Sequence, residues 1–381
     1  MTETGNIFEF QRKTAKIKVV GVGGGGGNAV NRMVEAKISA VDFVALNTDS
    51  QDLRRNLAPY RVQMGENLTK GLGVGGDPEK GRKAAEESAE QIRQVVRGVD
   101  LLFVTAGMGG GTGTGAAPVV AKVAREECGE DILIIGVVTR PFQFEGNTRA
   151  QQAESGIREI RKYVDSLLVI PNERLFSIID KHTSDSDAYR MADEVLRQAI
   201  QGITDIITRA GQVNVDFNDV KRVMANSGPA LIGIGEKSGE GKHLAAAREA
   251  VKSPLLENAE LDGARGLIVH FLSRKGDLTL MEQREAVDFI RETASKDVVL
   301  IYGTAYDESV QEDSLRITVI ATGFSNDLTT RKVSARKVLR QASPERGGAL
   351  PGGPGAQKEE PVRDEMLVPA FLRRGKKKGF F

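Results

Sequence analysis

The sequence predicts an α/β protein built on a parallel sheet flanked by helices, and three observations lead to that prediction. Over the first three hundred or so residues, short β-rich runs alternate with segments of helical periodicity. The runs are almost continuously apolar, as expected for strands that are buried on both faces. The chain has 381 residues, 40% apolar and 28% charged, which is the composition of a folded soluble protein with two or three domains.

The predicted strands of the first region follow one another with a helical pattern in each interval. The strands are expected at 16–20, 41–46, 101–105, 132–138 and 166–170. Between them, apolar residues recur at helical spacing, for instance at Val30, Met33 and Val34. These helices are the crossovers that parallel strands require.

A longer apolar stripe continues from Ala188 to Thr208 and stops before Gly211. A helix of this length is able to bridge two domains. Beyond it, the pattern predicts a helix at 281–294 and strands at 266–272, 298–304 and 315–321. We therefore expect a second, smaller domain of mixed α/β structure.

Charge and cysteine content exclude several classes of protein. The 53 Lys and Arg residues balance 52 Asp and Glu, so no chain-wide field favours nucleic acid. Cys128 is the only cysteine, and neither a CxxC nor an HExxH pattern occurs, which argues against a disulfide or a structural zinc. The first residues lack the apolar core of a signal peptide, and the longest apolar run, Ile132 to Val138, is too short to span a bilayer. We expect a cytoplasmic protein with no transmembrane segment and no nucleic-acid partner.

A first glycine-rich loop, Gly21 to Asn28, follows a predicted strand and opens a predicted helix. Glycines let the backbone approach phosphates closely, and a helix N-terminus supplies N–H donors and a positive dipole. By itself the loop is ambiguous, because Gly21, Gly23 and Gly26 also fit the dinucleotide fingerprint GxGxxG. At this point a tight turn without a ligand and a Rossmann-type NAD(P)-dependent oxidoreductase both remain open.

A second glycine-rich loop, Gly107 to Gly115, again lies between a predicted strand and a predicted helix. A dinucleotide-binding fold needs only one such loop, whereas two loops at the carboxyl ends of neighbouring parallel strands converge on one anion. Thr112 and Thr114 add hydroxyl donors. No GxxxxGK[ST] motif occurs, so we expect backbone and hydroxyl groups to hold the phosphates and Mg²⁺ to offset their charge.

Six segments resemble, in the same order, the FtsZ family of bacterial tubulin-like division GTPases. They are GVGGGGGNAV at 21–30, NTD at 47–49, GMGGGTGTGAAPV at 107–119, RPFQFEG at 140–146, NVDFNDV at 214–220 and VPAFLRR at 368–374. The resemblance covers about residues 15–323 and the C-terminal peptide. It implies a tubulin-like GTPase domain with a parallel sheet, a long central helix, a second smaller mixed α/β domain and a disordered tail. It also implies a cytoplasmic GTPase that polymerises head to tail into filaments of the bacterial cell-division ring.

The resemblance further implies which residues bind GTP or GDP. The phosphates would be held by Gly24, Gly25, Gly26, Gly27, Asn28, Gly111, Thr112 and Gly113. Glu145 and Arg149 would lie around the ribose and phosphates, Asn172 and Asp193 would read the base, and Tyr189, where the family often has Phe, would stack on it.

The chemistry of Asp193 agrees with a preference for guanine. A carboxylate can accept hydrogen bonds from the N1–H and the exocyclic amine of guanine, which adenine does not present on that edge, so GTP should bind in preference to ATP. Without the resemblance, Asp193 is better explained as an ordinary solvent-facing acid on the long helix.

Asn214, Asp216 and Asp219 admit two interpretations. The spacing of the two acids at the start of a predicted helix favours an N-cap with a second acid stabilised by the helix dipole. The resemblance instead implies that this loop enters the nucleotide site of the next subunit and positions the attacking water, so that hydrolysis depends on self-assembly. A nucleotide-binding scaffold that does not hydrolyse GTP is a further alternative, and the presence of both acids argues against it.

Asn47 and Asp49 follow the second predicted strand, at the sheet edge where α/β proteins bind ligands. They are equally suitable as turn residues.

The last residues are expected to form a tail with a docking function. Proline and glycine crowd the segment 326–362, which we interpret as a disordered linker. A basic tail is usually only a solvated charged segment. The VPAFLRR match implies instead that residues 363–381 bind membrane-tethering and regulatory division proteins, and the added basic residues leave direct attraction to anionic lipid open.

The predicted organisation therefore has six parts. They are an N-terminal arm (1–14), a GTP-binding domain (15–187), a bridging helix (188–210), a C-terminal activation domain (211–325), the linker (326–362) and the docking peptide (363–381).

Overall fold

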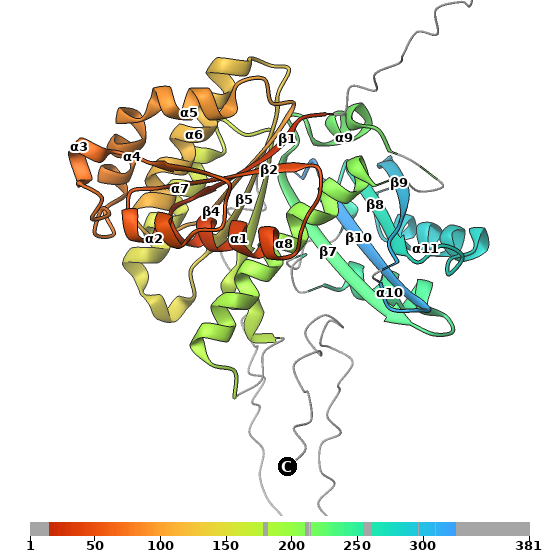
Figure 1. Cartoon of the computed structure of the whole chain (residues 1–381). Helices are drawn as coiled ribbons and strands as arrows, with labels where there is room; N and C mark the ends of the chain where they lie inside the picture. The colour runs from red at the N-terminus through yellow and green to blue at the C-terminus, as the bar shows by residue number, and fades with distance from the viewer. Residues whose placement is uncertain are drawn as a thin grey trace, which may run out of the picture.

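The computed structural model describes residues 15–177, 182–209, 213, 215–253, 256, 261–295, 297–308 and 310–324. One ten-stranded sheet runs through this part of the chain, with the strand order β3-β2-β1-β4-β5-β6-β7-β10-β8-β9 (Figure 1). The pairs from β3 to β7 and the pair β8–β9 are parallel, whereas β10 is antiparallel to both of its neighbours. The predicted parallel first region and mixed second region are confirmed.

The strands of the sheet are β1 (Ile17–Val22), β2 (Val41–Asn47), β3 (Tyr60–Gln63), β4 (Leu101–Gly107), β5 (Leu133–Arg140), β6 (Ser166–Pro171), β7 (Gly228–Ser238), β8 (Gly266–Ser273), β9 (Val299–Tyr306) and β10 (Ser314–Thr322). The helices are α1 (Gly23–Glu35), α2 (Ser50–Arg55), α3 (Glu66–Thr69), α4 (Pro78–Glu87), α5 (Ala89–Val96), α6 (Thr112–Cys128), α7 (Asn147–Ile160), α8 (Asp185–Thr208), α9 (Phe217–Met224), α10 (Lys242–Val251) and α11 (Leu280–Glu292). Short 3₁₀ turns follow β5 and β6, namely η1 (Gln143–Glu145) and η2 (Asn172–Ser177).

Alternation along each strand divides the apolar residues between two helical layers. Ile17 and Val19 of β1 join a core cluster with α1, α8 and α9, whereas Val20 and Val22 join a cluster with α4, α5, α6 and α7. In the second region α10 and α11 close a third cluster over β8 and β10. The sheet is therefore covered on both faces, which explains why its strands are nearly continuously apolar.

Strand β7 joins the two regions but does not appear among the sequence-predicted strands. Its glycines weaken the strand signal, since glycine has low β-propensity. The structure supplies the reason for them: a methyl group at Gly233 would lie 2.0 Å from the carbonyl oxygen of Ala250, and one at Gly235 would lie 2.0 Å from that of Ala246. These glycines let α10 pack directly on the strand.

Helix α8 is the predicted long helix, and it begins three residues before Ala188. Ser184 caps it by accepting a hydrogen bond from the backbone N–H of Asp187, and acids in the first turn favour the N-terminal end of the dipole. Its buried stripe packs against the sheet and α1, and Figure 1 shows it running between the two regions.

The parallel strands give the sheet two distinct ends. We call the end where β1, β4, β5 and β6 finish the carboxyl edge, and the end where they begin the amino edge. The parts predicted at 1–14, 326–362 and 363–381 lie outside the described residues, and the domain boundaries stay predictions.

Candidate functional site

The two glycine-rich loops meet at the carboxyl edge, following the adjacent strands β1 and β4. Gly23, with φ at +71°, lies so close to the second loop that a methyl group on it would be 2.8 Å from the backbone nitrogen of Gly113. A methyl group at Gly25 would lie 3.2 Å from the nitrogen of Gly107. The two backbones therefore form one surface, as predicted for a shared anion site.

The buried glycines of the first loop are required by packing. A methyl group at Gly26 would approach the carbonyl oxygen of Thr105 to 2.3 Å, and Asn56 donates a 2.9 Å hydrogen bond to the carbonyl oxygen of Gly27. These residues fix the first turn of α1 against the sheet, so that its N–H groups are held at the carboxyl edge.

The remaining residues of the first loop lie at the surface of the protein. Gly24, Gly25 and Asn28 are exposed, and the nearest atom to a methyl group on Gly24 would be the Asp52 carboxylate at 3.6 Å. A cavity of about 210 Å³ opens here between α1 and α2, lined by Gly24, Gly27 and Asn28 among others. The loop thus presents backbone and one amide side chain to a ligand from the start of a helix.

The second loop is braced by its two threonines in different ways. Thr112 lies in the first turn of α6, with its hydroxyl oxygen 2.7 Å from that of Thr48. Thr114 is buried and accepts a 2.8 Å hydrogen bond from the N–H of Gly109. Thr112 therefore lies at the loop surface. Thr114, which we expected to donate to the ligand, instead stabilises the conformation of the loop. Gly111, the N-cap of α6, is buried against Val74 and Asp77.

Asn47 and Asp49 behave largely as the turn residues that the sequence left possible. The side-chain oxygen of Asn47 accepts hydrogen bonds from the N–H groups of Thr48 and Asp49. Asp49 caps α2 by accepting from Gln51 and Asp52. The Asn47 amide, however, also lines the 210 Å³ cavity and lies 3.4 Å from an Asp52 carboxylate oxygen.

Glu145, Arg149 and Tyr189 form a cluster at the ends of β5 and α8. Glu145 is paired with Arg149 one helical turn away, and one of its oxygens accepts a 2.9 Å hydrogen bond from the N–H of Phe142. The ring of Tyr189 is 41% exposed and meets Phe142 edge to face at 5.5 Å. Partial burial, and then the Glu145 charge, raise the pKa of Tyr189, so its hydroxyl stays protonated.

Asn172 lies directly after β6 and is 5% exposed. Its side-chain oxygen is buried and has no hydrogen-bond partner among the described residues. Leaving such an acceptor unpaired costs about 1 to 3 kcal/mol, so the residue is suited to a ligand that donates to it.

Asp193 lies one turn after Tyr189 on α8. Burial raises its pKa from 3.8 to about 7, and the positive charge of Arg32 on α1 opposes that rise. No hydrogen bond to its carboxylate is present in the described part of the chain. The packing of α1 against α8 therefore brings a poised carboxylate to the helix that carries the first glycine loop.

The two predicted catalytic acids, Asp216 and Asp219, lie away from the glycine-rich loops. Asp216 caps α9, and it and Asp219 exchange hydrogen bonds in a capping box: the N–H of Asp219 donates to Asp216 at 2.9 Å, and the N–H of Asp216 donates back at 3.4 Å. Asn214 lies outside the described residues. The interpretation of the acids as caps is confirmed, and a catalytic role stays a prediction.

Helix α9 belongs to the amino edge. Lys221 donates to the carbonyl oxygen of Asp131, just before β5, and Ser166 at the start of β6 donates to the carbonyl oxygen of Met224. Strands of six to eight residues separate the two edges by roughly 20 Å or more. The predicted catalytic acids therefore do not reach the glycine loops of the same chain.

Sequence reasoning missed several residues of the carboxyl edge. Each of four residues contacts or charges a predicted site residue: Asp52 on α2, Asn56 directly after α2, Thr48 after β2 and Arg32 on α1. Their polar side chains resemble those of any surface helix or turn. The pairing of β1 with β2 brings Thr48, Asp52 and Asn56 to the loops, and the packing of α1 on α8 brings Arg32 near Asp193.

The described residues contain no cluster of three or more His, Cys, Asp or Glu side chains able to hold a metal ion. A single carboxylate, Asp52, lies beside Gly24. This arrangement fits Mg²⁺, which usually keeps several waters and is held by one or two carboxylates together with substrate phosphates. Among the described helices, none is long and apolar enough to cross a membrane.

Comparisons with known proteins agree with this geometry. Residues 16–180 match the family model of the Tubulin/FtsZ GTPase domain, and residues 228–325 match that of the FtsZ family C-terminal domain. An empty FtsZ dimer from M. jannaschii is 42% identical, covers 82% of this chain and 89% of its own, and has a TM-score of 0.76. A point mutant of FtsZ from M. jannaschii is also 42% identical over 82% of this chain and 92% of its own, with a TM-score of 0.78. The fold extends to CetZ2 from Haloferax volcanii, a GTPγS-bound protofilament, at 22% identity, 82% and 94% coverage and a TM-score of 0.70.

Proposed function

The chain belongs to the FtsZ family, and from that membership we propose that it hydrolyses GTP in a site shared between subunits of a head-to-tail filament. The family model over residues 16–180 is that of a GTPase domain, which supports a guanine nucleotide as the ligand of the carboxyl edge. The NAD(P)-dependent oxidoreductase that the first glycine loop left open is not supported by either family match.

One observation carries the proposal of a shared site. The glycine loops lie at the carboxyl edge, whereas Asp216 and Asp219 lie on α9 at the amino edge. Along α8, Thr208 is about 22 Å from Asp193 at 1.5 Å per residue, and α9 follows beyond that end. The acids meet a nucleotide only if the amino edge of one subunit faces the carboxyl edge of the next. Such a heterologous contact repeats without closing and produces filaments.

The carboxyl edge supplies the binding part of the reaction. N–H groups at the starts of α1 and α6 hold the phosphates, with Gly24 to Asn28 on one side and Gly111 to Gly113 on the other. Glu145 and Arg149 border the ribose and phosphates. Tyr189 stacks on the base, while Asn172 and Asp193 take its hydrogen-bond donors. The donors at N1 and the exocyclic amine of guanine match the carboxylate of Asp193.

The incoming acids supply the hydrolytic part. A water oxygen bonds to the γ-phosphorus as the bond to the β–γ bridging oxygen breaks, and GDP and phosphate leave. Asp216 and Asp219 orient this water and accept its proton, and Asn214 is assigned to the same loop. Asp52, the carboxylate beside the loop, would help to hold Mg²⁺, which when bound would offset the charge of the phosphates.

The cellular part of the proposal rests on family membership. Filaments of this protein form the bacterial cell-division ring at the division site. Residues 363–381, outside the described part, dock the membrane-tethering and regulatory proteins that hold the filament there. Turnover of GTP then sets the turnover of the filament.

Phosphate release from GTP and Mg²⁺, measured against protein concentration, tests the shared site. Activity per molecule should rise above a threshold concentration, and Asp219→Ala should lower it at least about a hundredfold while GTP still binds. Asp219→Asn should keep a polar side chain in the capping box of α9 but should lose activity. Asn218→Ala, an exposed neighbour on the same helix, should remain active.

Mixing two inactive variants separates the shared site from a self-contained one. Asp219→Ala has an intact nucleotide site, and Asp193→Ala has intact acids. Their mixture should hydrolyse GTP faster than the sum of the two alone. Activity per molecule that is unchanged by dilution, with no gain on mixing, would show that each subunit is catalytically complete.

A further inference from the structure

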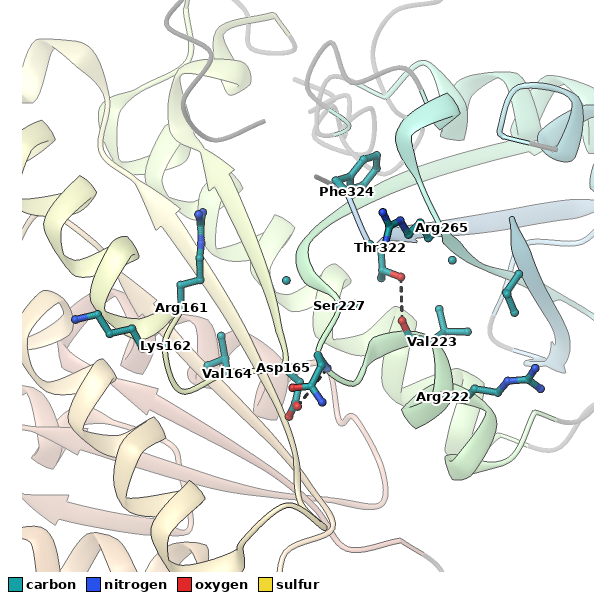
Figure 2. A pocket seen from close by; sticks show the side chains of 15 residues that line it. Arg161, Lys162, Val164, Asp165, Arg222, Val223, Ser227, Arg265, Thr322 and Phe324 are labelled. Atoms are coloured by element: carbon teal, nitrogen blue, oxygen red, sulfur yellow. Dashed lines mark hydrogen bonds between the residues drawn. The ribbon is translucent and has the colours of Figure 1, made fainter. Parts of the chain in front are cut away.

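A second, larger cavity of about 680 Å³ opens at the amino edge, where the two regions of the sheet meet. Its lining comes from the segments before β6, β7, β8 and β9 and from the end of β10. Figure 2 shows Arg161 on one side of this space and Arg265 and Phe324 on the other. The function proposed above does not use this cavity.

The lining is strongly cationic. Among the described residues it contains Arg161, Lys162, Arg222 and Arg265 but only one acid, Asp165. That acid is already satisfied, because Arg125 lies 2.6 Å from one of its oxygens and the N–H of Ile134 donates to the same oxygen at 2.8 Å.

The cations of the rim are largely uncompensated. Arg222 and Arg265 are exposed and form no ion pair with any described acid. Lys162 follows helix α7, and among the described residues it is paired only with the exposed Glu159 in the last turn of that helix. Burial, and then the nearby Arg140, lower the pKa of Arg161, and the charge of Glu154 opposes that shift.

The lining of the cavity also contains apolar side chains. Val164, Val223 and Val299 line it together with Gly228 and Gly266. The cavity therefore suits a peptide that carries acids beside apolar residues, rather than a small inorganic anion.

The chain itself contains such a peptide, and the described part of the chain ends at this cavity. Thr322, Gly323 and Phe324 line the cavity, and Phe324 is the last described residue. Four of the six acids beyond it are concentrated in EEPVRDE at 359–365, which MLV follows. Thirty-four residues separate Phe324 from Glu359, enough to span roughly 110 Å when extended, so length does not prevent a return.

We propose that the acidic segment 359–365 of this chain docks into the cationic cavity at the amino edge. The four acids and one arginine of the segment give it a net charge of −3, complementary to the lining. Docking holds residues 363–381 against the folded body and withholds them from partners. It is a contact within one subunit and requires neither nucleotide nor assembly.

Zero-length cross-linking with a water-soluble carbodiimide tests this contact on the full chain, dilute and without nucleotide. The reagent joins a carboxylate to an adjacent amine, so Lys162 should become linked to an acid of 359–365 in the same chain. Lys83, an exposed lysine on α4, is the matched control and should not. Peptide mass spectrometry of an equal mixture of ¹⁵N-labelled and unlabelled chains distinguishes links within a chain from links between chains.

Charge reversal provides the specificity control. Arg222→Glu with Arg265→Glu, both at exposed positions, should lower the Lys162 link about tenfold, since like charges then face the segment. Arg284→Glu with Arg291→Glu, an equal change on α11, should leave it unchanged. Adding Glu359→Lys and Glu360→Lys to the first pair should restore a link through Asp364 or Glu365.

Three outcomes would overturn the proposal. They are a Lys162 link no more frequent than that of Lys83, a link indifferent to reversal of the cavity charges, and a link found only between isotopically different chains. None of these outcomes depends on GTP hydrolysis, so the experiment tests the docking contact independently of the proposed shared catalytic site.

Discussion

The two edges of the sheet differ in whether their polar groups have partners within one chain. The carboxyl edge is incomplete within one chain: an exposed glycine backbone borders a cavity, the Asn172 oxygen has no partner in the described part of the chain, and the Asp193 carboxyl has a pKa raised to about 7. At the amino edge, Asp216 and Asp219 satisfy each other in a capping box. Unsatisfied groups indicate a ligand site inside one subunit, whereas a catalytic role for satisfied ones is visible only when a second subunit is considered.

The largest expected effect is a difference in stability between two glycine variants at the carboxyl edge, one at a glycine required by packing and one at a glycine that faces the ligand. Gly26→Ala places a methyl group 2.3 Å from the Thr105 carbonyl oxygen and should destabilise the chain by about 3 kcal/mol. Gly24→Ala meets nothing closer than 3.6 Å and should change stability by less than ~1 kcal/mol, while weakening GTP binding. Thermal unfolding and nucleotide titration of both variants measure the contrast. Equal destabilisation by the two would contradict the division of roles.

The next effect concerns the specificity of the carboxyl edge. Asp193→Asn replaces a carboxylate that accepts two hydrogen bonds by an amide that accepts one and donates one, so GTP affinity should fall about a hundredfold. The same amide can accept from N1–H of xanthine and donate to its 2-oxo group, so affinity for XTP should rise. Competition between GTP and XTP for the variant measures this change in nucleotide preference. A variant that loses both nucleotides equally would show that Asp193 does not face the base.

The pH dependence of GTP binding follows from the same carboxyl group. Below pH 7 the free protein holds a proton on Asp193 that guanine must displace, so the Kd should increase up to about tenfold per pH unit as pH falls from 7 to 5. The opposite sign applies to the stability of the free chain: because the folded pKa is raised, stability falls as pH rises from about 4 to 7.

Isothermal titration in buffers of different ionisation enthalpy measures the proton released on binding. Asp193→Asn should abolish both slopes, apart from contributions common to all acids. A Kd that is independent of pH in this range would contradict the assigned contact.

The smallest effect is expected at the amino edge. Asp216→Ala removes the N-cap of α9 and should lower the free energy of unfolding by about 1 kcal/mol. Asp216→Asn, which keeps an acceptor at the cap, should restore most of that stability. If hydrolysis in the assembled protein remains low with Asn, the charge has a function beyond the cap. Chemical denaturation alongside phosphate release compares the two.

The sequence by itself determined the class of fold and the two glycine-rich loops. Hydrophobic period and glycine content are local properties, so the eight predicted strands, the long helix and both glycine loops could be identified without knowing what packs against them. The family resemblance also predicted roles for Asn172 and Asp193, which no periodicity would distinguish from ordinary polar residues.

The tertiary structure decided everything that depends on contacts between distant segments. Glycines inside β7 hid a strand because their cause is the close approach of α10, and Asp52 and Arg32 join the site only through strand pairing and the packing of α1 on α8. The separation of α9 from the glycine loops follows from the direction of the parallel strands. A local pattern records which face of an element is buried, but only the assembled sheet fixes which edge each side chain reaches.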